Sequence, residues 1–219
     1  GTNNTATTSE RARRMEGLGV DGLLVVTPYY NKPSQEGLAA HFRAVAGAVS
    51  PSTSVCLYNV PSRTAVSLDP ETIETLAVLP NVDAIKEATT DVLRASRVIA
   101  AVGDNATVLA GDDAAFLAMM ALGAKGIVSA ASNAVPAPFV QLYKKYRWGD
   151  IDDARAVHAL YLAPIMSMYA VVNPVGVKAA AKLKGIIASD EVRLPLVGMT
   201  DAQRDTLREA LSSGGLLGL

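Results

Sequence analysis

The sequence predicts an α/β protein built around a parallel sheet. Short apolar runs alternate along the chain with stretches whose apolar residues recur every three or four positions. The apolar runs have the length and composition of strands that are buried on both faces, as the strands of parallel sheets are. No segment rich in Pro, Gly or Ser divides the 219 residues, and half of them are hydrophobic, which suits one sizeable core. Alternation of the two segment types with short connections is typical of repeated βα units.

Five apolar runs are expected to be strands, and each ends in polar or turn residues. They cover residues 22–28, 54–61, 82–89, 106–113 and 126–133. Helical patterns cover residues 8–18, 34–49, 69–79, 91–103 and 113–123, and a long helical region follows from Pro138. Asp69 is the predicted N-cap of its helix and Pro70 its first residue. Gly103 and Gly123 are predicted C-caps.

Two architectures fit five parallel strands: an open doubly wound sheet and a closed (β/α)8 barrel. No glycine-rich dinucleotide fingerprint follows any predicted strand. Chemically active side chains follow several strands instead, and sites assembled from many strand ends are typical of barrels. We therefore predict a barrel.

Composition narrows the kinds of partner and cofactor that we expect. The net charge of −1 carries no electrostatic signal for nucleic acid. No apolar run approaches the roughly 20 residues that would span a membrane, and the opening residues do not resemble a signal peptide. The single cysteine, Cys56, suits a reducing cytoplasm. His41 and His158 lie far apart, so no metal site and no cofactor are expected.

Lys86 stands in the apolar run VDAIKEAT, where a charged side chain is unexpected. Strand alternation puts it on one face with Val82, Ala84 and Ala88, whose small side chains leave room for it. Burial would lower the pKa of the amine, and a neutral lysine amine forms Schiff bases with carbonyls. The alternative is a lysine whose ammonium reaches water at the end of the strand.

The stretch LYNVPSRT strengthens the chemical interpretation of Lys86. Tyr58 lies late in the preceding strand, where a phenol can move protons during carbinolamine chemistry. Arg63 follows in the loop, and a guanidinium group binds a carboxylate through two hydrogen bonds. The alternatives are a core tyrosine and a solvated arginine.

Two other strand ends carry weaker signals. Adjacent tyrosines, Tyr29 and Tyr30, are more typical of packing or interfaces than of catalysis. In LAGDD, Asp112 or Asp113 is most simply an N-cap. Gly111 would allow a ligand to approach the backbone closely.

Five motifs together resemble the dihydrodipicolinate synthase (4-hydroxy-tetrahydrodipicolinate synthase) family: VTPYYNKPSQEGL, YNVPSRT, IKEAT, LAGDD and NPVGVKAA. The likeness runs through residues 1–219, in order and with matching spacing. It implies a class I aldolase-type lyase on a (β/α)8 barrel. Such an enzyme condenses pyruvate with L-aspartate-4-semialdehyde in lysine (diaminopimelate) biosynthesis. It is expected to be cytoplasmic, free of cofactor, and a homotetramer arranged as a dimer of dimers.

The resemblance assigns roles residue by residue. It implies that Lys86 forms the Schiff base with pyruvate, that Tyr58 relays protons, and that Arg63 binds the carboxylate of the aldehyde. Tyr30 resembles a relay tyrosine donated across a tight dimer. The remaining matched positions are Val128, whose backbone would contact pyruvate, Gly111 in the pocket, and Tyr29, which resembles a tyrosine of a lysine feedback site.

The resemblance also implies that the family's barrel begins about three βα units before residue 1. Residues 1–8 match the loop after the third strand, and the family's threonine pair has no counterpart in the sequence. We therefore expect strands 4–8 of a barrel in residues 1–149 and a C-terminal helical extension packed on it in residues 150–219. We also expect an open lumen that returns the pKa of Lys86 toward its free value of about 10.4, and unpaired edges at strands 22–28 and 126–133.

Two other functions are compatible with these residues. A sister pyruvate-dependent lyase, acting on N-acetylneuraminate or a 2-keto-3-deoxy-sugar acid, would share Lys86 and Tyr58. Arg63 in VPSRT favours the short carboxylated aldehyde over a sugar acid. A catalytically dead fragment that serves only in assembly is the remaining alternative.

Overall fold

The structure is a computed structural model, and it describes residues 1–217. The chain forms two compact units, Gly1–Val128 and the residues from Ser129 onward. All predicted site residues lie in the first unit. The division at residues 149 and 150 between a partial barrel and a helical extension stays a prediction.

The first unit is an α/β structure with a parallel sheet, as the sequence predicts. Its strands are β1 (Gly22–Val26), β2 (Ser54–Asn59), β3 (Ala84–Glu87), β4 (Thr107–Ala110) and β5 (Gly126–Ile127). They lie side by side in chain order, and every neighbouring pair is parallel. A doubly wound sheet reverses its strand order at a switch point, so this topology excludes that alternative. Each strand ends before its predicted range does, and β3 and β4 also begin later than predicted.

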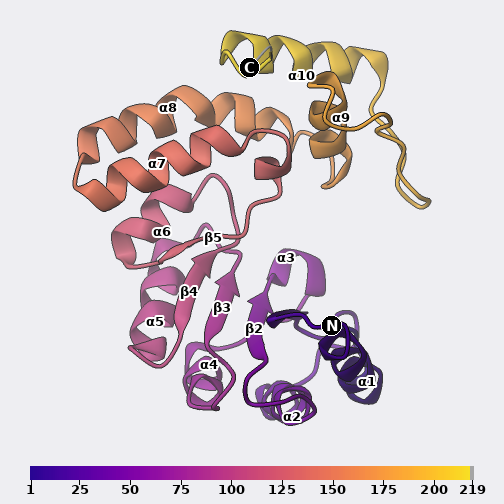
Figure 1. Cartoon of the computed structure of the whole chain (residues 1–219), viewed down its shortest axis with the longest axis vertical. Helices are drawn as coiled ribbons and strands as arrows, with labels where there is room; N and C mark the ends of the chain where they lie inside the picture. Colours follow the sequence, from indigo (N-terminus) through magenta and orange to yellow (C-terminus); the bar gives the residue numbers. More distant parts are fainter. Residues whose placement is uncertain (218–219) are drawn as a thin grey trace. The chain divides into compact units, whose positions relative to one another are not determined.

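Helices α1 (Thr5–Glu16), α2 (Gln35–Ala46), α3 (Pro61–Thr64), α4 (Pro70–Ala77), α5 (Val92–Val102) and α6 (Phe116–Leu122) complete the unit. Figure 1 shows α4, α5 and α6 along one side of strands β2, β3 and β4. The short helix α3, which carries Arg63, was not predicted. Asp69 and Pro70 stand where predicted, although the Asp69 side chain makes no capping hydrogen bond. Gly103 and Gly123 end α5 and α6 with positive φ angles.

The two faces of the sheet differ sharply in burial. Successive strand residues point to opposite faces. On the helix-covered face, Leu57 and Ile85 are 0% exposed. On the opposite face, Leu24 is 45% exposed, and Tyr58 and Cys56 are only partly buried. The core therefore lies between the sheet and its helices, and the second face is the open side that Lys86 shares.

The second unit is helical. It contains the 3₁₀ turn η1 (Ala131–Asn133) and helices α7 (Pro136–Trp148), α8 (Ile151–Ser167), α9 (Val175–Leu183) and α10 (Asp201–Ser213). Helices α7 and α8 pack together, and α10 contacts both α8 and α9 (Figure 1). Within residues 1–217, every helix is too short or too polar to cross a membrane.

Candidate functional site

Lys86 and Tyr58 form the centre of the candidate site because the sheet register pairs them. They are direct partners on β3 and β2, so their side chains leave the sheet on the same face. The Lys86 Nζ atom lies 4.1 Å from the centre of the Tyr58 ring. The pairing of the two strands is thus enough to bring the side chains of Lys86 and Tyr58 together.

Burial sets the protonation of Lys86. The residue is 9% exposed, and this burial lowers the pKa of its amine. The negative charge of Asp113 opposes the shift. A cation over an aromatic ring is also favoured, by about 0.5–2 kcal/mol. Burial is the largest of the influences on the pKa, so a larger fraction of the amine is neutral than in free lysine.

The expectation that Lys86 becomes solvated, with a pKa near that of free lysine, was wrong. The open face of the sheet does not expose its side chain, because the Tyr58 ring lies over the amine. A lysine in a strand is therefore shielded by its immediate neighbours, and its burial does not need a closed lumen.

Tyr58 retains the proton of its phenol. Burial raises the pKa of its phenol, and the positive charge of Arg63 partly opposes the change. The phenol therefore keeps its proton at neutral pH. Arg63 lies in α3, immediately after β2, and its side chain is exposed. Its effect on Tyr58 places the guanidinium at the same end of the sheet as Lys86.

Two groups beside Lys86 have an electrostatic role that the sequence did not reveal. Asp113 is 8% exposed, and its charge acts on Lys86. The prediction that Asp112 or Asp113 caps the next helix was wrong, because the N-cap of α6 is Ala115. Asp112 Oδ1 accepts hydrogen bonds from the Ala114 and Ala115 backbone amides in the turn before that helix. Cys56 lies on the same face as Tyr58, and burial raises the pKa of its thiol to about 11. It therefore remains a thiol at neutral pH.

Gly111 and Val128 lie at the same end of the neighbouring strands. A Cβ atom at Gly111 would stand 2.9 Å from the Cβ and 3.0 Å from the Cα of Ala88, closer than atoms pack. The residue is thus glycine because the chain after β3 approaches it, which differs from the predicted approach of a ligand. The Val128 amide donates to the Ala110 carbonyl, at 2.9 Å. That amide is therefore already paired within the sheet.

Tyr29 and Tyr30 follow β1 and are not part of this cluster. Tyr30 is 86% exposed with a φ of 76°, and Tyr29 is 42% exposed. A non-glycine residue in left-handed backbone is uncommon and is often found at functional positions. Both side chains are accessible to a partner.

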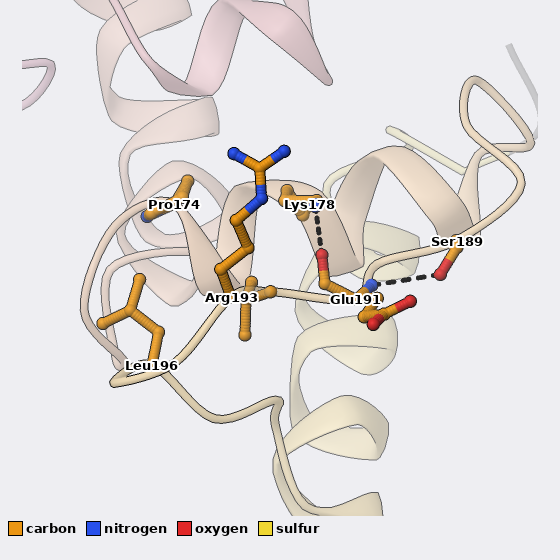
Figure 2. A pocket seen from close by; sticks show the side chains of 7 residues that line it. Pro174, Lys178, Ser189, Glu191, Arg193 and Leu196 are labelled. Carbon is orange, nitrogen blue, oxygen red and sulfur yellow. Dashed lines mark hydrogen bonds between the residues drawn. The ribbon is translucent and has the colours of Figure 1, made fainter.

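A separate hollow lies in the second unit. It has a volume of about 680 Å³ and is lined by Pro174, Lys178, Ser189, Glu191, Val192, Arg193 and Leu196. Figure 2 shows the Arg193 guanidinium standing away from the ribbon and Lys178 bonded to the backbone carbonyl of Glu191. No predicted site residue lies in its wall. Among residues 1–217, no three His, Cys, Asp or Glu side chains are placed to hold a metal ion.

Parallel βα units in chain order, with a buried lysine beside a tyrosine at the strand ends, define an α/β protein with a shielded amine at the carboxyl ends of its strands. The comparisons agree with this class and narrow it. The model of the dihydrodipicolinate synthetase family matches residues 1–213, and the chain belongs to that family.

Known relatives match almost the whole chain. The 4-hydroxy-tetrahydrodipicolinate synthase of Pelobacter propionicus is 44% identical over 217 residues, which are 99% of this chain and 74% of the relative. Among solved structures, dihydrodipicolinate synthase from Thermotoga maritima superposes with a TM-score of 0.95 at 37% identity, covering 99% of this chain and 74% of that one. The chloride-inhibited synthase of Acinetobacter baumannii complexed with pyruvate gives a TM-score of 0.93 at 36% identity, with the same coverage.

Proposed function

We propose that this protein condenses pyruvate with L-aspartate-4-semialdehyde to 4-hydroxy-tetrahydrodipicolinate, a step of lysine biosynthesis, through a Schiff base on Lys86. The observation that carries the proposal is the buried Lys86 amine, 4.1 Å from the Tyr58 ring, in a chain of this family. The 4-hydroxy-tetrahydrodipicolinate synthase from P. propionicus and the pyruvate complex from A. baumannii support the reaction and its first substrate.

Capture of pyruvate begins with the neutral amine. The lone pair of Lys86 Nζ forms a bond to the carbonyl carbon of pyruvate as the π bond of the carbonyl breaks. The oxygen takes up one proton and the nitrogen gives one up, which leaves a neutral carbinolamine. A second protonation lets that oxygen leave as water, and the C=N bond of the imine forms. Loss of a proton from the methyl carbon then gives an enamine, whose carbon attacks the aldehyde of the second substrate.

Tyr58 donates both protons of this sequence in our proposal, and it regains a proton from the nitrogen between the two donations. Its raised pKa keeps the phenol protonated, so it can donate to the departing oxygen. It stands beside the amine, on the neighbouring strand, so one group serves both the addition and the loss of water.

Arg63 binds the carboxylate of the aldehyde substrate. A guanidinium group holds a carboxylate through two parallel hydrogen bonds, and the exposed Arg63 lies at the strand end that carries Lys86. A short carboxylated aldehyde suits this arrangement better than a sugar acid does. The sister lyases are therefore the second candidate, and their sugar-acid substrates are the comparison to make in the assay.

The remaining assignments belong to the same proposal. The exposed Tyr30 extends the proton relay in a neighbouring subunit of a homotetramer, and Tyr29 belongs to a lysine feedback site. Val128 and Gly111 line the pyruvate pocket, with the Val128 carbonyl as the ligand contact. We place the enzyme in the cytoplasm.

The five parallel strands are, in this proposal, the last five of an eight-stranded barrel. Their chain order and the helices along one side of the sheet are features of (β/α)8 barrels. The exposed side of Leu24 would then face the lumen. A chimera that places the first three βα units of the P. propionicus relative before residue 1 would supply the rest of the ring.

Trapping of the imine tests the proposal. Residues 1–219 and the chimera are each incubated with pyruvate and borohydride, which reduces an imine to a stable amine, and the adduct is located by peptide mass. We expect it on Lys86. Lys86→Arg should abolish it, because a guanidinium stays protonated. Lys125→Arg is the control, on an exposed lysine. An adduct on another lysine, or none in either protein, would overturn the proposal.

A further inference from the structure

Glu87 is a fully buried carboxylate that the proposed reaction does not use. It follows Lys86 on β3, so its side chain points to the opposite, helix-covered face of the sheet. It is 0% exposed. A charged group at such a position is retained only when it is paired and hydrogen-bonded.

Two donor groups make three hydrogen bonds to this carboxylate. The Asn59 side-chain amide donates to both Glu87 oxygens, at 3.0 Å each, because Asn59 and Glu87 are register partners on β2 and β3. The Arg94 Nη2 atom on α5 donates to Oε2 at 2.9 Å. Burial raises the pKa of Glu87, and the charge and hydrogen bond of Arg94 oppose that rise.

The two partners of Glu87, Asn59 and Arg94, both form hydrogen bonds with the backbone of Leu68. The Leu68 amide donates to Asn59 Oδ1 at 2.9 Å, and the Leu68 carbonyl accepts from Arg94 Nη2 at 2.7 Å. Leu68 itself is 0% exposed. It closes the segment Val60–Leu68, which begins directly after Asn59 and includes α3 with Arg63. Both ends of this segment are thus tied to Glu87.

We propose that Glu87 and Arg94 are a positioning pair that holds the segment Val60–Leu68, and with it Arg63, in register with Lys86. Strand β3 then positions both substrates: Lys86 on one face captures pyruvate, and Glu87 on the other fixes the group that receives the aldehyde's carboxylate. This inference rests on the proposed function for the role of Arg63. The anchoring itself rests on the hydrogen bonds alone.

Charge explains why a neutral side chain cannot replace Glu87. In Glu87→Gln, one oxygen becomes an NH₂ group that faces donors, and Arg94 loses its counter-charge. The Arg94 side chain is 19% exposed, so it can turn toward water and release the Leu68 carbonyl. Gln35 still holds the Ser67 carbonyl and the Asp69 amide, at 2.8 and 3.0 Å. We therefore expect the segment to loosen without unfolding of the protein.

Hydrogen exchange on the 219-residue protein tests the anchor. Glu87→Gln and Arg94→Met should each speed exchange of the segment Val60–Leu68 by about tenfold or more, because protection reflects local opening. The amides of β2 and β3 should keep their protection. Arg97→Met removes an exposed arginine from the same helix and should change nothing. Unchanged exchange of the segment in both variants would overturn the proposal.

The double variant Glu87→Gln/Arg94→Met separates positioning from stability. Removing both partners leaves no unpaired buried charge, so resistance to urea should return most of the way to that of the wild type. The Leu68 carbonyl still lacks its donor, so exchange of the segment should stay fast. If protection returned together with stability, the pair would be only structural, and the proposal would be wrong.

Kinetics in the chimera test the link to Arg63. Each single variant should lower kcat/KM for the aldehyde by about tenfold, the loss typical of a weakened charge-assisted contact, with borohydride trapping of pyruvate unchanged. In an Arg63→Ala background, Arg94→Met should have no further effect, because the positioned group is gone. Additive losses would overturn the link. Absence of any wild-type pyruvate adduct would instead overturn the proposed function, and hydrogen exchange would still decide the anchor.

Discussion

One backbone register places two functional pairs at once. Tyr58 opposes Lys86, and the next residues, Asn59 and Glu87, oppose each other on the other face. A shift of one residue would exchange the two faces and bring the amine into the core. The buried Asn59–Glu87 hydrogen bonds oppose such a shift, so they also keep the Lys86 amine beside the Tyr58 ring.

Substitution of Arg63 should affect the aldehyde substrate and leave pyruvate capture intact. Arg63→Ala should lower kcat/KM for aspartate semialdehyde by roughly ten- to a hundred-fold, because a charge-assisted contact contributes on the order of 1.5–3 kcal/mol. Trapping of pyruvate on Lys86 should persist. Steady-state kinetics and borohydride trapping on the same preparation measure both.

Arg43→Ala is the matched control for Arg63, since this exposed arginine lies on α2, away from the strand ends. Equal loss of pyruvate trapping and aldehyde turnover in Arg63→Ala would show that the arginine supports the structure of the site and does not bind the substrate.

Part of the candidate site could be predicted from the sequence, because reactive side chains stand at the ends of predicted strands. Lys86, Tyr58 and Arg63 each follow or end a strand, and parallel strands bring their carboxyl ends together. Glu87 and Asp113 could not be assigned in this way. Alternation gives the face of Glu87 but not its partner Arg94, which another element supplies. The effect of Asp113 on Lys86 likewise depends on distances across strands.

At the scale of elements, local signals fixed the positions of helices and strands but not the ends of the strands. Strand β3 stops at Glu87 although the apolar pattern continues to Ala88. The chain stays bonded to β2 one residue further, because the Ala88 amide donates to the Asn59 carbonyl at 3.0 Å. The apolar pattern alone therefore does not give the last residue of the strand.

The contact between α1 and α2 should make stability depend on pH through His41. The residue is 3% exposed, its Nδ1 is hydrogen-bonded to Thr5 Oγ1 at 2.9 Å, and its buried Nε2 has no partner among the described residues. Burial lowers the pKa of His41 in the folded protein. Below the unfolded value of about 6.5, the unfolded chain binds the proton more readily. The contribution of His41 is thus complete above this pH and is lost as pH falls toward the folded pKa.

Urea denaturation at about pH 7.5 and about pH 5.5 measures this contribution. The free energy of unfolding should fall less between the higher and the lower pH in His41→Asn than in the wild type. His158→Asn, on α8, is a second test of the same effect, because burial lowers the pKa of His158 as well, so the drop should also be smaller than in the wild type. An equal drop in His41→Asn and the wild type would show that His41 takes no part.

At the scale of the whole molecule, alternation of βα units predicted the class of fold, and strand order then decided between two architectures. Order could not be read from the sequence, because both architectures use the same units with the same connections. It is set by which strands pair, and the pairing in chain order leaves β1 and β5 each with one neighbour among the described residues.

The last prediction compares residues 1–219 with the chimera. Pyruvate capture on Lys86 should occur in both, because Tyr58 and neighbouring residues of β2–β4 bury the amine without help from other strands. Condensation with the aldehyde should be at least about tenfold faster in the chimera, since an enclosed site strengthens charge-assisted contacts such as that of Arg63. The edges of β1 and β5 should also promote self-association of residues 1–219, which size-exclusion chromatography with light scattering would detect. A monodisperse 219-residue protein with turnover equal to that of the chimera would contradict both expectations. It would show that the open face of the sheet is already sufficient for the complete reaction.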